Sequence, residues 1–219
     1  MNKIIVSAWV LAASVLASCG GQSTTESKAP EAPAVASEGA VSMAIDTTAS
    51  SLGWKAKKVT AEHHGIIRVR SGELKVDSGK PVAGKFIIDM NSIVVQDLTD
   101  PTMNGKLLGH LKSDDFFSAA THPEGVFEIT SAEPVSGATA DQPNFLIKGN
   151  LTLKGITKPI EFPALVKAEG DALQATGEAV LDRTLWDIRY GSGKFFKGLG
   201  DKMIYDTFSV LISIKAVKA

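Results

Sequence analysis

The fold is decided by the stretch Phe145-Leu146-Ile147-Lys148-Gly149-Asn150-Leu151-Thr152-Leu153-Lys154-Gly155-Ile156-Thr157-Lys158. Apolar residues at positions 145, 147, 151 and 153 alternate with polar residues at 148, 150 and 152, which is the pattern of a β-strand with one buried face. The five residues from Lys154 contain the glycine that a tight turn favours, and a second strand follows them. This stretch therefore predicts a long antiparallel hairpin.

The same alternation recurs along most of the chain. Phe86, Ile88 and Met90, for example, alternate with Lys85 and Asp89. Many strands with little helix and no repeat of fixed period favour a single closed barrel, because closure removes exposed sheet edges and leaves an interior that can hold a ligand. We expect strands near 52–59, 65–70, 72–77, 82–90, 125–132, 144–154, 158–167, 172–182 and 206–217.

One long segment, Asp97 to Ala120, interrupts the strand pattern. Leu107, Leu108 and Leu111 have helical spacing, and Ser113-Asp114-Asp115 could cap a second short helix that carries Phe116 and Phe117. Long connections in compact domains usually carry function or are disordered. We expect this insertion to cover one end of the barrel.

The N-terminus has the features of an export signal. Lys3 precedes an apolar run from Ile4 to Leu16, which is too short to span a bilayer. Residues 1–18 are therefore predicted to be a removed leader. The segment Leu16-Ala17-Ser18-Cys19 resembles the bacterial lipoprotein cleavage box, which implies that Cys19, the single cysteine, is acylated and holds the protein on a membrane. The alternative is an ordinary secretory signal followed by an unpaired thiol.

Residues 19–40 are predicted to be a flexible tether, because they are rich in Gly, Ser, Glu, Ala and Pro and cannot bury a core. The barrel domain would then occupy residues 41–219. Gly20 after the cysteine resembles the pattern that directs lipoproteins to an outer membrane. We therefore expect a protein of a bacterial cell envelope, lipid-anchored to the outer membrane and facing the periplasm.

Composition and motifs argue against several functions. The chain has 23 Lys and Arg against 24 Asp and Glu, and the leader removes only Lys3, so the charge gives no reason to expect a nucleic-acid partner. The spacing of the four histidines does not match a metal site. The segment Gly191-Ser192-Gly193-Lys194 does not match a phosphate-binding loop. No nucleophile with a partner base can be assigned. We expect no metal, no cofactor and no enzymatic activity. The oligomeric state stays open.

Five motifs in order resemble the YceI family over about residues 45 to 216. They are Asp46-Thr47-x5-Gly53-Trp54, Gly84-x-Phe86-x5-Asn91-Ser92-Ile93, His110-Leu111-Lys112-Ser113-Asp114-Asp115-Phe116-Phe117, Gly149 to Pro159, and Asp182-Arg183-Thr184-x-Trp186. The resemblance implies an extended, lipocalin-like barrel of eight antiparallel strands with a helical insertion. It also implies an apolar tunnel that holds a long-chain isoprenoid or fatty amphiphile, in a carrier or a store.

The candidate tunnel residues are mostly inward positions of the predicted strands. Core packing alone could explain any one of them, and a barrel packed solid would make the protein a structural or interaction module instead. Trp54 and Trp186 could line the tunnel or fill a core, and His110 could contact a ligand head group or cap a helix. The candidate set is Trp54, Phe86, Ile88, Met90, His110, Phe116, Phe127, Phe145, Ile147, Leu151, Phe162, Trp186 and Phe208.

Overall fold

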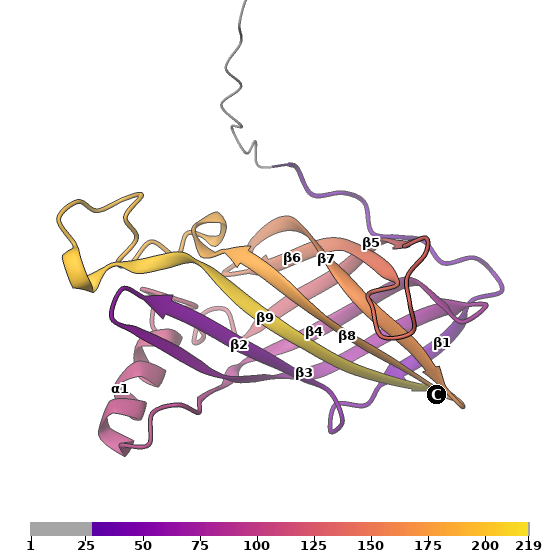
Figure 1. The fold of residues 1–219 in the computed structure, drawn as a ribbon, viewed down its shortest axis with the longest axis horizontal. Helices are drawn as coiled ribbons and strands as arrows, with labels where there is room; N and C mark the ends of the chain where they lie inside the picture. The colour runs from indigo at the N-terminus through magenta and orange to yellow at the C-terminus, as the bar shows by residue number, and fades with distance from the viewer. Residues whose placement is uncertain (1–27, 219) are drawn as a thin grey trace, which may run out of the picture.

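A computed structural model describes residues 28–218, which form one antiparallel barrel with a helix across one end (Figure 1). The predicted leader, Cys19 and the first part of the tether lie outside the described residues. The strands are β1 (Val41–Ile45), β2 (Ser51–Lys58), β3 (Ala61–Asp77), β4 (Lys80–Val95), β5 (Glu124–Pro134), β6 (Phe145–Leu153), β7 (Ile156–Glu169), β8 (Ala172–Asp182) and β9 (Ile204–Lys218). The helices are α1 (Pro101–Lys112) and two short 3-10 turns, η1 (Arg183–Trp186) and η2 (Gly200–Lys202).

The barrel closes because its first and last long strands pair with each other. Strands β2 to β9 follow one another around the wall, each antiparallel to the next, and β9 returns to pair with β2. The short β1 lies between β3 and β9 beyond the end of β2, so it completes the wall there. The predicted eight-stranded antiparallel barrel with a helical insertion is confirmed.

The predicted hairpin forms, but its turn is shorter than the five residues from Lys154 to Lys158 that were expected. β6 and β7 pair from Phe145 with Ala164 down to Leu153 with Ile156, so the turn consists of Lys154 and Gly155 alone. Both turn residues have positive φ, 49° and 72°, as a two-residue turn that matches the twist of its strands requires. The apolar positions of β6 face inward and are buried.

Three details of the predicted secondary structure were wrong, two in the strands and one in the insertion. The predicted strands 65–70 and 72–77 are one strand, β3, whose pairing with β4 shifts register between Val69 and Ser71. A bulge thus takes the place of the expected break. β1 was missed, because its five residues are too few for a clear alternation. The second helix at Phe116 is absent: residues 114–117 form turns, and the N–H groups of Phe117 and Ala119 bond to carbonyls of Leu111 and Lys112 at the end of α1.

The helical spacing predicted at Leu107, Leu108 and Leu111 falls within α1, which begins after the N-cap residue Asp100. Asp100 is the N-cap, and its side chain accepts a hydrogen bond from Met103 N at 2.8 Å. Asn104 Nδ2 donates to the carbonyls of Val95 and Leu98, and Lys112 Nζ donates to the carbonyl of Asn91. These bonds attach α1 to the end of β4, so the helix is held against one end of the barrel (Figure 1). Within residues 28–218, no helix is long and apolar enough to cross a membrane.

The described part of the predicted tether is attached to the barrel wall. Asn150, which is buried on the outer side of β6, accepts a hydrogen bond from Glu31 N and donates one to Glu31 O, at 3.2 and 2.6 Å. Ala34 N donates to the carbonyl of Ile129 on β5 at 2.9 Å. Composition predicted the lack of regular structure in this segment, but it gave no sign of these contacts.

Candidate functional site

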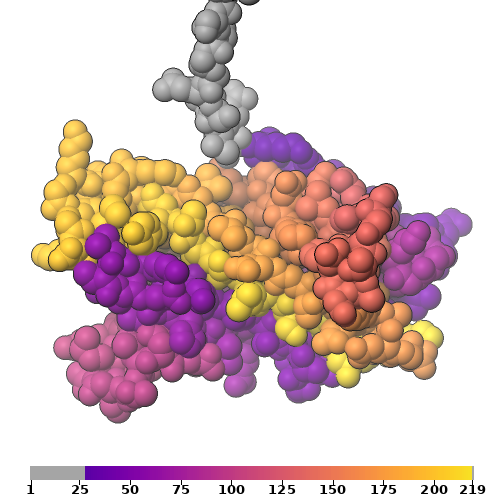
Figure 2. All heavy atoms as spheres, in the orientation of Figure 1, coloured from indigo at the N-terminus to yellow at the C-terminus, as the bar shows by residue number. Residues whose placement is uncertain are grey.

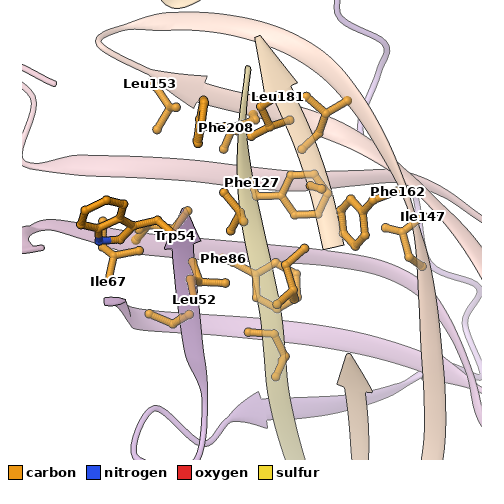
Figure 3. Close-up of a pocket in the computed structure, with 18 of the residues that line it drawn as sticks. Leu52, Trp54, Ile67, Phe86, Phe127, Ile147, Leu153, Phe162, Leu181 and Phe208 are labelled. Carbon is orange, nitrogen blue, oxygen red and sulfur yellow. The ribbon is translucent and has the colours of Figure 1, made fainter. Parts of the chain in front are cut away.

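The barrel encloses an apolar cavity of about 210 Å³. All eight long strands contribute side chains to its wall, and Leu111, Phe116 and Phe117 of the insertion close the wall at the α1 end. Figure 3 shows side chains from opposite sides of the barrel converging on this space. The surface that these side chains present to the cavity is apolar, so the cavity suits an apolar molecule.

Three phenylalanines gather in the middle of the cavity (Figure 3). The ring centroids of Phe86 and Phe127 are 6.1 Å apart, and those of Phe127 and Phe162 are 5.8 Å apart. Gly149 makes this possible, because a Cβ at that position would lie 2.4 Å from the Phe127 ring and 2.6 Å from the carbonyl of Glu128. The absence of a side chain at Gly149 thus leaves room for the Phe127 ring against β6.

Most of the candidate tunnel residues lie on the cavity wall. They share inward positions on the strands, except Phe116, which comes from the insertion. The residues on the wall are Trp54, Phe86, Ile88, Met90, Phe116, Phe127, Ile147, Leu151, Phe162 and Phe208.

The other three candidates lie away from the wall. Phe145 is buried at the start of β6 within the core. Trp186 is fully buried in η1, where Nε1 donates to the carbonyl of Leu151 at 3.1 Å. His110 is partly exposed at the end of α1, where its Nε2 lies 3.2 Å from Asp115 Oδ2 and its ring packs against Phe116 and Tyr190. Alternation identifies the face of a strand, but it does not say which inward residues border the empty space.

Sequence reasoning missed Arg183, which is the one charged residue of the wall among residues 28–218. Its Nε and both Nη atoms donate five hydrogen bonds: to the carbonyls of Ile188, Tyr190, Ile204 and Tyr205, and to Asp206 Oδ1 at 3.2 Å. Burial lowers the pKa of the guanidinium, and the neighbouring carboxylates of Asp206 and Asp182 oppose that change. Because a guanidinium has five N–H donors, the protein itself satisfies all of them. Arg183 therefore holds the segment between β8 and β9 in place and has no donor left for a ligand.

The remaining polar groups of residues 28–218 do not form a metal-binding cluster. In the part of the chain that the structure describes, no group of three His, Cys, Asp or Glu side chains could hold a metal ion. His63 Nδ1 lies 2.7 Å from Asp97 Oδ2, and the backbone N–H of His64 donates to Asp97 Oδ1 at 3.0 Å. Burial opposes ionisation of Asp97, but these hydrogen bonds outweigh it and lower the pKa of the carboxyl. The contacts fasten β3 to the start of the insertion.

Solved structures with this fold come from several bacteria. The Burkholderia cenocepacia protein BcnA matches with a TM-score of 0.62 at 22% identity, over 79% of this chain and 99% of that one. A polyisoprenoid binding domain from Saccharophagus degradans matches with a TM-score of 0.56 at 16% identity, over 81% and 98%. Likenesses at these identities establish the barrel fold.

The sequence itself matches curated relatives and a family. A UPF0312 protein of Pseudomonas putida is 30% identical over 107 residues, which are 49% of this chain and 50% of the relative. One from Pseudomonas savastanoi is 32% identical over the same shares. The alignments thus span about half the length of these relatives. The family described as YceI-like domain matches residues 43–216, from β1 to β9. Because that match takes in nearly all of the barrel, the chain belongs to the YceI-like family.

Proposed function

We propose that this protein binds one long-chain isoprenoid or fatty amphiphile inside its barrel and serves as a lipid-anchored carrier or store in a bacterial envelope. The observation that carries the proposal is the apolar cavity, which side chains from all eight barrel strands surround. The Saccharophagus degradans neighbour, described as a polyisoprenoid binding domain, supports the same class of ligand.

Magnitudes make an apolar chain a suitable guest. An apolar cavity of about 150 Å³ holds one benzene ring, so the cavity of about 210 Å³ has room for a slim apolar group somewhat larger than six carbons. At about 0.8 kcal/mol per buried methylene, fifteen carbons would contribute roughly 12 kcal/mol. Because association costs about 4 kcal/mol or more, a guest must bury at least about fifteen carbons in the barrel and its mouth to reach near-micromolar affinity, roughly 8 kcal/mol.

The wall also predicts loose selectivity for the tail. Arg183, the charged residue on the wall, has every donor occupied by protein atoms, and Trp54 Nε1 donates to the carbonyl of Val94 at 3.1 Å. Recognition of the tail would then depend on length and thickness, because neither of these groups offers it a free hydrogen bond.

The rival function is a structural or interaction module with a solidly packed barrel. Extraction of the purified protein with organic solvent, followed by mass spectrometry, separates the two. A long-chain lipid recovered in about equimolar amount supports the binding function. Extracts without lipid from protein produced in several hosts would favour the structural module.

The lipid anchor has a test of its own. Cys19→Ala removes the single thiol of the chain and with it the predicted acylation site. We expect a wash at high salt to release the variant from the membrane fraction, whereas the unchanged chain stays there through the same wash. A variant that sediments with membranes at high salt would contradict the anchor and leave the ligand proposal intact.

A further inference from the structure

The exposed aromatic side chains are all at one place on the surface. Within residues 28–218 they are Tyr190, Phe195, Phe196 and Tyr205, each 45–49% exposed. The first three belong to the segment that joins β8 to β9, and Tyr205 is the second residue of β9. This segment, 187–203, protrudes at the end of the barrel that carries α1, as the yellow-orange atoms at the upper left of Figure 2 show. Other exposed apolar residues, such as Val180 and Leu211, lie on the outer wall.

The charges around these rings are mainly positive. Lys194 and Lys197 flank Phe195 and Phe196 in sequence, and the Arg189 guanidinium lies 4.9 Å from the centre of the Phe195 ring. Arg189 pairs with Asp187 and Lys194 with Asp182. Lys197 and Lys202 have no ion pair within the described residues, while Asp201 is the only further acidic residue of the segment. Two exposed phenylalanines therefore lie among cations.

We propose that segment 187–203 is a membrane-docking surface, which inserts Phe195 and Phe196 into the interface of a bilayer that contains anionic lipids. Aromatic side chains favour the boundary between head groups and acyl chains, and nearby Lys and Arg are attracted by anionic head groups. A half-exposed pair of phenylalanines is unfavourable in water, and it gains free energy when the bilayer covers it. This function is additional to ligand binding and does not require a ligand.

The docking surface lies directly beside the cavity. The Tyr190 ring packs edge-on against His110 at 4.5 Å and lies 5.9 Å from Phe116. Phe116 and Ile188 both line the cavity. A bilayer that receives Phe195 and Phe196 would therefore meet the barrel at the end where Phe116 of the insertion lines the cavity.

The tether is long enough for this orientation. Glu31 is fixed to Asn150, and Asn150 is four residues from Lys154, whose ammonium donates to the carbonyl of Asp187 at the base of the segment. Cys19 precedes Glu31 by twelve residues, which can span at most about 40 Å. An anchor at Cys19 and the docking segment can thus reach the same membrane.

The test uses the mature chain with Cys19→Ala, so that no acyl group takes part. Its sedimentation is measured with vesicles of equal parts phosphatidylethanolamine and phosphatidylglycerol, and with vesicles of phosphatidylcholine. We expect binding to the anionic vesicles only, weakened by salt. Phe195→Ser with Phe196→Ser should lower the bound fraction about tenfold or more, and Lys197→Gln with Lys202→Gln several-fold. The matched control, Val180→Ser with Leu211→Ser, should change nothing.

A second readout identifies the part of the protein that docks. Because Cys19→Ala removes the single cysteine, Lys197→Cys or Val180→Cys creates one site for an environment-sensitive fluorophore. The emission of the probe at 197 should shift to shorter wavelength on anionic vesicles, and the probe at 180 should not shift. No vesicle binding by the parent chain, equal binding by the double-serine variant at 195 and 196, or equal shifts of the two probes would overturn the proposal.

Discussion

Trp186 and Leu151 are joined by a hydrogen bond from the indole Nε1 to the backbone carbonyl, with a length of 3.1 Å. The bond links η1 to β6, and the indole is fully buried behind the wall residue Leu151. Trp186 is therefore placed to support the cavity wall without touching a guest. Arg183 lies in the same short helix. Its five hydrogen bonds link η1 to residues 188–190 and to the start of β9.

For Trp186→Phe, we expect a loss of stability of about 1–2 kcal/mol, because the ring is smaller and the hydrogen bond disappears. Affinity for a fluorescent long-chain probe should stay the same, since the indole is off the cavity wall. Urea unfolding and probe titration measure the two quantities. A large fall in affinity with unchanged stability would instead put Trp186 in contact with the ligand.

Arg183→Met should cost about 3–5 kcal/mol, because it leaves Asp206 without its cation and removes five hydrogen bonds. The matched control is Arg189→Met. Arg189 has a side chain that is 58% exposed and pairs only at the surface with Asp187, so its loss should change the free energy of unfolding by no more than about 0.5 kcal/mol. Equal costs for the two variants would argue against a structural role for the buried guanidinium.

Phe86→Ala and Phe145→Ala separate the cavity wall from the packed core. Both rings are nearly buried, but only Phe86 borders the cavity. We expect Phe145→Ala to cost about 3–5 kcal/mol with unchanged probe affinity. Phe86→Ala should cost less, because part of that ring already faces empty space, and should lower probe affinity about tenfold by removing contacts with the guest.

Thermal unfolding and probe titration of the two variants provide the comparison. If both variants lost the same stability and neither changed probe affinity, the space beside Phe86 would not be the ligand site.

The sequence could predict the features that depend on neighbouring residues, but not those that depend on contacts between distant residues. Alternation in β6 and the turn residues that follow Leu153 predicted a strand, its buried face and the position of the hairpin, because each depends on residues near in sequence. Whether Phe127 borders the cavity also depends on the neighbouring strand, where the missing side chain of Gly149 makes room for the Phe127 ring. The sequence of one strand contains no such information. The docking of Glu31 on Asn150 is another contact of this long-range kind.

The hydrogen bonds of Asp97 with the backbone N–H of His64 and the ring of His63 predict a pH dependence. Because the pKa of Asp97 is lowered in the folded protein, the ionised carboxylate stabilises the fold above the pKa of about 3.9 that an unfolded aspartate has. That contribution is lost as the pH falls through the lower pKa of the folded state. The stability difference between the parent and Asp97→Asn should therefore be largest above about pH 4 and shrink at lower pH.

Urea unfolding of both proteins over this range measures the difference. Asp141→Asn is the control, because Asp141 is 89% exposed and its ion pair with Lys167 is at the surface. A difference for Asp97→Asn that grew as the pH fell would contradict the assigned direction.

The last prediction concerns the insertion between β4 and β5 as a cover for the cavity. Leu111, Phe116 and Phe117 line the α1 end of the cavity, and the hydrogen bonds between the segment and the barrel come largely from single side chains, among them Lys112 with Asn91 and Lys154 with the carbonyl of Asp114. Strand β6, by contrast, has ladder hydrogen bonds on both sides. A guest that packs against these three apolar residues should therefore slow amide hydrogen exchange in residues 97–120 more than in 145–153, which are already protected. The measurement compares delipidated protein with protein reloaded with a long-chain fatty acid. Uniform slowing across the domain, or none in the insertion, would mean that the guest does not use it as a cover.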